Sequence, residues 1–158
     1  MVGKDDLKKI TIFTDLPEEM IEAIGSIAQI QDAEEETVLF EQEQDLSTLY
    51  MLLSGTVFLN SKSPSGKMLT LDQVVPGQSF GVSALMGRGR SSFTAICGLK
   101  SRLVTVSSDK LKGLFEKDPK LGYQVMLRVV KRFKSRTDKH TKQFLHYLAT
   151  HPDIKGLA

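Results

Sequence analysis

The fold of this chain is decided by one stretch near its middle, Gln78-Ser79-Phe80-Gly81-Val82-Ser83-Ala84-Leu85-Met86-Gly87-Arg88-Gly89-Arg90-Ser91-Ser92-Phe93-Thr94-Ala95. Glycine lets a backbone come close to a ligand, and consecutive unpaired N–H groups bind anions. An arginine matches phosphate oxygens with two parallel hydrogen bonds. The stretch therefore predicts a pocket for one phosphate-like anion, with the amides after Gly81 and the guanidinium of Arg90 facing it. A glycine-rich turn beside an arginine is also common in all-β proteins, and the residues alone leave both interpretations open.

Two pieces of this stretch, Phe80-Gly81-x-x-Ala84-Leu85 and Arg90-Ser91-Ser92-x-x-Ala95, resemble the phosphate-binding cassette of the cyclic nucleotide-binding domain family. Three other segments are similar to that family's opening helix, central hairpin and start of the last helix: Leu7–Leu16, Leu49–Val57 and Asp118–Gly122. The resemblance implies cyclic AMP or cyclic GMP as ligand, with no other cofactor. It also implies a ligand site made by Phe80, Gly81, Val82, Ser83, Ala84, Arg90, Ser91 and Ser92.

The chain departs from the family's pattern at Val82, where the family has a glutamate that accepts the ribose 2′-hydroxyl. Valine accepts no hydrogen bond, and the loop between Gly81 and Arg90 also looks one residue shorter than usual. A buried hydroxyl left without a partner costs about 1–3 kcal/mol. We therefore expect a ten- to hundred-fold loss of affinity for a cyclic nucleotide.

Length and composition indicate one ordinary globular domain. The chain has 158 residues, 41% of them hydrophobic and 25% charged, and a net charge of +2. No apolar run is long enough to span a bilayer, and the N-terminus lacks a signal-peptide core, so we expect a cytoplasmic protein without membrane contact. The single cysteine, Cys97, predicts a reduced core residue, and the scattered histidines have no metal-ligand spacing.

The hydrophobic period predicts a β-roll over about residues 28–107, between helices. Pro17 begins an N-terminal helix, and six strand-like runs follow: 38–40, 49–53, 56–60, 68–74, 92–97 and 102–107. Turn residues at Ser54-Gly55 and Pro64-Ser65-Gly66 predict antiparallel pairing of consecutive strands. Many short strands favour a sandwich or barrel, and the family resemblance selects a jelly roll, or double-stranded β-helix.

Helices are predicted again over about residues 108–150. Ser108 is the expected N-cap of a short helix, and Asp118-Pro119 begins a second helix that continues to about Ala149. A helix of some thirty residues is longer than the roll is wide, at about 1.5 Å per residue. In the family this helix commonly forms a dimer seam and a lid, so we expect a homodimer through it. The alternative is that it folds back on its own sheet.

The second helix is also basic, with Lys131, Arg132, Lys134, Arg136, Lys139 and Lys142. These cations predict a solvated face rather than a nucleic-acid site. If the chain is complete at Ala158, it has no room for the helix-turn-helix domain of the family's transcription factors. For a fragment of a longer chain, that argument would not hold.

Three functions follow from these patterns. The first is a module that senses a cyclic nucleotide or related anion and transmits the signal through the Phe115 to Pro119 junction, with Gly113 and Gly122 as hinges. The second is a degenerate module that dimerises or docks an unknown protein partner. The third, an enzyme, is not supported, because the chain shows no nucleophile elbow, no useful carboxylate pair and no metal triad.

Overall fold

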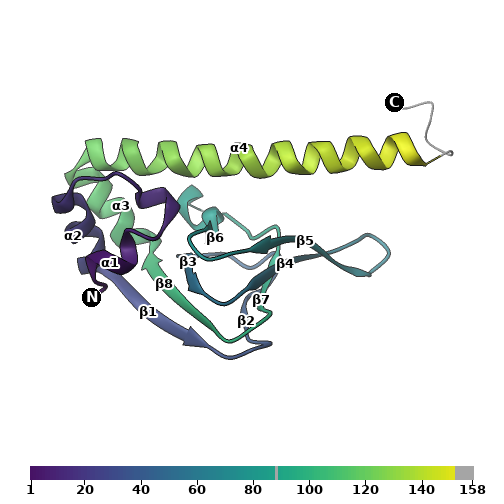
Figure 1. Ribbon diagram of the computed structural model, residues 1–158, viewed down its shortest axis with the longest axis horizontal. Coiled ribbons are helices and arrows are strands. Elements are labelled where there is room, and N and C mark those ends of the chain that lie inside the picture. The colour runs from purple at the N-terminus through teal and green to yellow at the C-terminus, as the bar shows by residue number, and fades with distance from the viewer. Residues whose placement is uncertain (88, 152–158) are drawn as a thin grey trace.

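The computed structural model describes residues 1–87 and 89–151 and begins with short helices. These are α1 (Lys4–Leu7), the 3-10 helix η1 (Thr11–Phe13) and α2 (Glu18–Ile27). Pro17 is the N-cap residue of α2, and Ile21 and Ile24 on its inner face are buried. The N-terminal helices pack at one end of the molecule, beside the beginning of the long last helix (Figure 1).

In the described part of the chain, eight strands form two antiparallel four-stranded sheets. One sheet has the order β1 (Ala28–Ala33), β8 (Ser101–Ser107), β3 (Thr48–Ser54) and β6 (Ser79–Phe80). The other has the order β2 (Val38–Phe40), β7 (Thr94–Cys97), β4 (Val57–Lys62) and β5 (Met68–Val74). This architecture confirms the predicted jelly roll. The strands predicted from the sequence did not include β1, although Ala28-Gln29-Ile30-Gln31 alternates apolar and polar residues, or β6, which has only two residues.

The predicted pairing of consecutive strands is correct at one turn and wrong at another. Strands β4 and β5 pair across the Pro64–Gly66 turn. Strands β3 and β4 do not pair, because the chain passes from one sheet to the other at Gly55. Gly55 has a φ of +98°, and a Cβ there would lie 2.6 Å from the carbonyl oxygen of Lys100. Ser54-Gly55 is therefore a corner of the roll, where glycine permits a close approach of two backbones.

Two hydrophobic clusters lie on opposite faces of the β1–β8–β3–β6 sheet. Leu103 of β8 points into the roll, where it packs in the cluster that contains Phe40 and Phe80. Its neighbour Val104 points the other way, into the cluster that the helices cover. The alternation of strand side chains thus produces both clusters, and Cys97 is buried in the inner one, as predicted.

The last two helices are α3 (Ser108–Lys117) and α4 (Pro119–Thr150). The prediction of Ser108 as N-cap is wrong: Ser107 has that position, and the N–H of Ser108 donates to the carbonyl of Ser47. The carboxylate of Asp118 does cap α4, accepting from the N–H of Leu121 at 3.1 Å. Helix α4 lies along one side of the roll and continues past the sheets (Figure 1). Within residues 1–87 and 89–151, no helix combines the length and apolar character that crossing a membrane requires.

Candidate functional site

The first wall of the site is built where β6 ends. Phe80 is fully buried and stacks with Tyr50, at a ring-centroid distance of 5.4 Å. Gly81 then has a φ of +76°, and a Cβ on it would lie 3.3 Å from the carbonyl oxygen of Thr48. Only glycine takes this conformation at low cost. It turns the chain into the 3-10 helix η2 (Val82–Met86), in which Ala84 is buried.

The second wall comes from the segment that leads into β7. The backbone of Ser91 is held on both sides, because its N–H donates to Gln44 and its carbonyl accepts from Glu43. The Ser91 hydroxyl donates to the carbonyl of Phe93 and accepts from the N–H of Phe93. This hydroxyl therefore orders the loop, whereas the side chain of the next residue, Ser92, is exposed.

These walls enclose a cavity of about 160 Å³. Five of the eight residues predicted for the site line it: Gly81, Val82, Ser83, Ser91 and Ser92. Phe80 and Ala84 lie in the core beneath it and support the turn. The other described residues that line it are Phe40, Leu59, Met86, Phe93, Phe133 and Arg136.

Arg90 does not line this cavity. Its side chain is 69% exposed, and its Nε lies 3.9 Å from a carboxylate oxygen of Asp45, which is itself 78% exposed. The two residues also form an isolated antiparallel bridge through their backbones. An ion pair between exposed side chains stabilises a protein little, so this contact holds the guanidinium only weakly.

Comparison with known proteins decides the family. The family model of the cyclic nucleotide-binding domain matches residues 30–118, which is more than half of the chain. The chain belongs to the cyclic nucleotide-binding domain family. A comparison with curated proteins finds no match.

Solved structures share the fold of this cyclic nucleotide-binding domain. A cyclic nucleotide-binding domain from Methylobacillus flagellatus is 22% identical with a TM-score of 0.81, and the match covers 90% of this chain and 80% of that one. The catabolite activator protein of Thermus thermophilus is also 22% identical, with a TM-score of 0.72 over 85% of this chain and 62% of that one. The regulatory domain of Toxoplasma gondii protein kinase A, solved with cyclic AMP, has a TM-score of 0.63 and 22% identity over 70% of this chain and 42% of that one.

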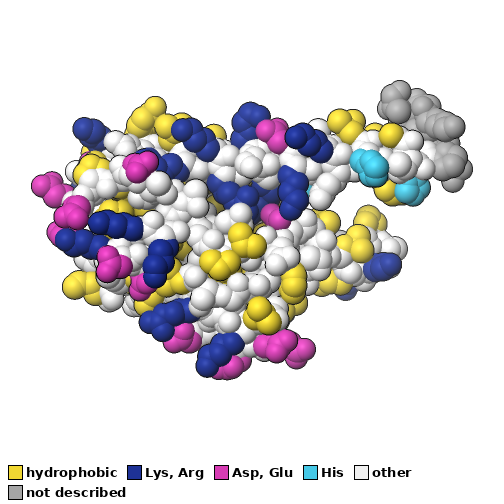
Figure 2. Space-filling view, in the orientation of Figure 1, with side chains coloured by type: hydrophobic (Ala, Val, Ile, Leu, Met, Phe, Trp, Pro, Cys, Tyr) yellow, Lys and Arg dark blue, Asp and Glu magenta, His cyan; other side chains and the backbone are white. Residues whose placement is uncertain are grey.

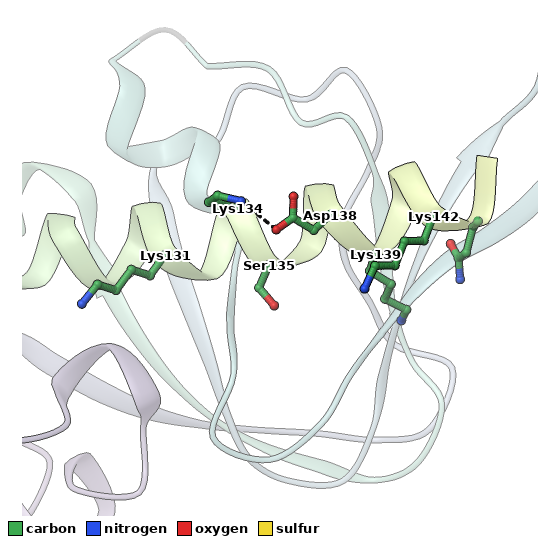
Figure 3. Close-up of a pocket in the computed structure, with 7 residues that line it drawn as sticks. Lys131, Lys134, Ser135, Asp138, Lys139 and Lys142 are labelled. Carbon is green, nitrogen blue, oxygen red and sulfur yellow. Dashed lines mark hydrogen bonds and ion pairs between the residues drawn. The ribbon is translucent and has the colours of Figure 1, made fainter. Parts of the chain in front are cut away.

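In this cyclic nucleotide-binding domain the last helix closes the cavity. Phe133 and Arg136 of α4 complete its lining, opposite the residues around Gly81. The prediction that the cations of α4 form a solvated face is therefore wrong for part of the run: Arg132 and Arg136 have side chains only 19% and 11% exposed. Lys131, Lys134 and Lys142 do lie outward, and Figure 3 shows Lys134 directed toward Asp138, 2.8 Å away.

The two largely buried arginines and the more exposed Lys139 converge on Asp72 of β5, whose side chain is 4% exposed. Its carboxylate oxygens lie 2.9 Å from Arg136 Nε, 3.4 Å from Lys139 Nζ and 4.0 Å from Arg132 Nη2. We call these four residues the Asp72 cluster. Figure 2 shows basic side chains gathered beneath α4 at the middle of this face, around a single acidic one.

The pKa values in the Asp72 cluster are set by burial and by neighbouring charges. Burial alone would raise the pKa of Asp72, but the N–H of Gln73 and the charges of Arg136 and Lys139 outweigh it and hold that pKa below its ordinary value. Burial, together with the nearby charge of Arg132, lowers the pKa of Arg136, although Asp72 acts in the opposite direction. An arginine stays charged at neutral pH even so. The cluster therefore has three positive charges and one negative charge.

The sequence contained a signal for this cluster that the analysis of charge alone missed. Leu121, Val125 and Val129 recur every four residues on the buried side of α4. A step of three residues from Val129 reaches Arg132, and a further step of four reaches Arg136, so both arginines lie near the same face of α4. The acidic partner could not be found in the same way, because only the fold brings β5 beneath α4.

Proposed function

We propose that this protein is a regulatory module that binds a small anionic ligand, a cyclic nucleotide or a related compound, between η2 and α4. The observation that supports this most is the cavity that five cassette residues share with two residues of α4. The amides after Gly81 would bind the anionic group, Ser83 and Ser92 would add polar contacts, and Arg90 would reach the ligand from the loop after its weak contact with Asp45 is released. The cyclic AMP in the related kinase regulatory domain supports this ligand class.

Two features predict that binding is weak and is coupled to movement. The cavity of about 160 Å³ is smaller than the 300–1,000 Å³ of typical ligand pockets, so a nucleotide requires α4 to move outward. Val82 also lines the cavity, at the position where the family's glutamate would accept the ribose hydroxyl. We infer that the ligand shifts α4 between two positions about the α3–α4 junction near Asp118, as the hinge prediction requires.

Isothermal titration calorimetry with cyclic AMP and cyclic GMP tests this function. Restoring the acceptor with Val82→Glu should tighten binding about ten- to hundred-fold. Val82→Leu serves as the control, because it enlarges the side chain but accepts no hydrogen bond. No heat with either nucleotide at millimolar concentration, for both the native protein and Val82→Glu, would refute nucleotide binding.

A second proposal is that the module acts by dimerising through α4. Two exposed apolar side chains of α4, Tyr123 and Val130, are seven residues apart, and Phe144 lies two such steps further, with Leu145 and Tyr147 beside it. The step between Val130 and Phe144 falls on Thr137. A seven-residue repeat is the pattern of a two-helix coiled coil. We therefore propose a homodimer in which two α4 helices pack along this stripe.

Arg90→Ala separates the two proposals. If the protein only dimerises or docks a partner, the variant should sediment as the native protein does, and no nucleotide should bind to either. If the protein senses a ligand, the variant should lose affinity while its sedimentation coefficient stays the same. We also propose that the chain forms one domain, that it catalyses no reaction and that it is located in the cytoplasm.

A further inference from the structure

Arg136 lies between two hollows of the molecule and lines both of them. Together with Phe133 it lines the cavity of about 160 Å³ beside Gly81, which we call the cassette cavity. Together with Asp72 it also lines the groove between α4 and β5. It is the one charged residue among the eleven described residues that line the cassette cavity. Arg90, the arginine of the sequence motif, is absent from both sets.

We propose that Arg136 supplies the positive charge that the cassette cavity offers to its ligand, and that the anionic group of the ligand competes with Asp72 for it. This inference rests on the proposed function, because it assumes an anionic ligand in the cassette cavity. It adds to the motif a ligand-binding residue on α4.

Because of the charges in the Asp72 cluster, moving Arg136 from Asp72 to the anionic group of the ligand costs little free energy. Asp72 faces three cations at 2.9–4.0 Å, so it keeps Lys139 and Arg132 when Arg136 turns to the ligand. A buried carboxylate that lost its only partner would be strongly destabilised, but Asp72 does not reach that state. The three cations also leave the cluster with two positive charges in excess, which favours a second anion nearby.

The environment of Arg136 makes it a stronger partner for an anion than Arg90 is. Its side chain is 11% exposed, against 69% for Arg90, and charges attract more strongly where water is excluded. Its guanidinium has several N–H donors in a fixed plane, which match a phosphate with two parallel hydrogen bonds. Because Phe133 lies on the same helix and lines the same cavity, an anion bound to Arg136 also acts on the position of α4.

The matched variants Arg136→Gln and Arg132→Gln test the assignment. Each removes one arginine of α4 that faces Asp72, but only Arg136 lines the cassette cavity. In titrations of the full chain with cyclic AMP, Arg136→Gln should weaken binding at least about tenfold, and Arg132→Gln by no more than about threefold. Equal losses in the two variants, or native affinity in Arg136→Gln, would overturn the assignment.

The competition is tested by changing the other members of the Asp72 cluster. Asp72→Asn removes the competing carboxylate and should tighten cyclic AMP binding, provided that circular dichroism shows a folded protein. Lys139→Gln should weaken cyclic AMP binding, because Asp72 then has one cation fewer and holds Arg136 more strongly. The Lys139 side chain is 56% exposed, so this variant is expected to fold and decides the question even if Asp72→Asn does not fold. Unchanged affinity in Lys139→Gln would contradict the competition.

Failure of this inference differs from failure of the proposed function. If the native protein binds cyclic AMP and only Arg90→Gln abolishes binding, the function stands and Arg136 is not the counter-ion. If the native protein and Val82→Glu bind neither cyclic AMP nor cyclic GMP, the proposed function fails and this inference fails with it.

Discussion

The two ends of α4 have similar side chains but different surroundings. In the packed part, Leu121 and Val125 are fully buried where α4 lies on α3 and η1, and further along Arg136 is held at Asp72. Contact with the roll continues as far as His140, whose Nε2 lies 3.2 Å from the carbonyl oxygen of Leu71. In the last turns, Phe144 and Leu145 are 61% and 58% exposed.

The difference shows that burial along α4 is decided by the surface beneath it. The packed part of α4 lies first on α3 and η1, which present apolar side chains, and then over β5, which presents a carboxylate. The last turns continue past the sheets (Figure 1). Large apolar side chains exposed together on a helix are typical of an interaction surface. The packed part and the exposed last turns of α4 can therefore be disrupted separately. Substitutions in the packed part should lower folding stability, whereas those in the last turns should change assembly.

The largest loss of folding stability is expected from Leu121→Ala in the packed part of α4. Replacing a fully buried leucine by alanine leaves a cavity and costs about 2–5 kcal/mol. For a domain of this size the melting temperature should fall by roughly 2–4 °C for each kcal/mol. Leu145→Ala is the matched control in the exposed last turns. Thermal denaturation of dilute protein should separate the two variants clearly, and equal shifts would contradict the comparison.

Asp72→Asn should cause the next largest loss of folding stability. It leaves three cations facing a neutral amide, and breaking a buried ion pair costs about 3 kcal/mol or more when both groups are fully buried. Because Lys139 is partly exposed, we expect a loss at or below that figure at neutral pH. Urea denaturation measures it. Asp138→Asn is the control, since the pair of Asp138 with Lys134 is exposed and should be nearly neutral.

The stability difference between the native protein and Asp72→Asn should depend on pH. The pKa of Asp72 is lower in the folded protein than in the unfolded chain, so its carboxylate stabilises the fold above the ordinary aspartate pKa of about 3.9. That contribution is lost as the pH falls through the lowered pKa of the folded state. Urea denaturation at several pH values should give a constant difference from pH 7 to about 5 and a shrinking one below about 4. A difference that grows in acid would show that the sign is wrong.

The smallest effect on folding is expected from replacing both Phe144 and Leu145 by serine. Both side chains are exposed, and surface substitutions usually change stability by no more than about 0.5 kcal/mol each. The same double variant should abolish the proposed dimer, which sedimentation velocity detects. A variant that stays dimeric would place the dimer contact elsewhere, and a large loss of stability in dilute protein would show that these side chains pack in the monomer.

The sequence by itself was enough to predict most elements of the fold. Strands Val38–Phe40 and Met68–Val74 were predicted at their observed bounds, and the long helix was predicted to end one residue before Thr150. Local signals determine these elements: short runs rich in apolar residues between turn residues for the strands, and a proline after a capping aspartate for the helix. The turn at Gly81 was also predicted, from the glycine itself, and the structure shows a left-handed backbone there with little room for a Cβ.

Only the tertiary structure decided which strands pair and which charges meet. Ser54-Gly55 reads as a hairpin turn in the sequence, but β3 and β4 separate there into two sheets, since a close approach at Lys100 fixes a corner. Arg90 and Arg136 are equally basic in the sequence, yet one faces water and the other lies between a buried carboxylate and the cassette cavity. Local preferences fix helices, turns and strands, whereas the partner of a charge depends on residues far away in the chain, which only the packing of α4 on the roll brings together.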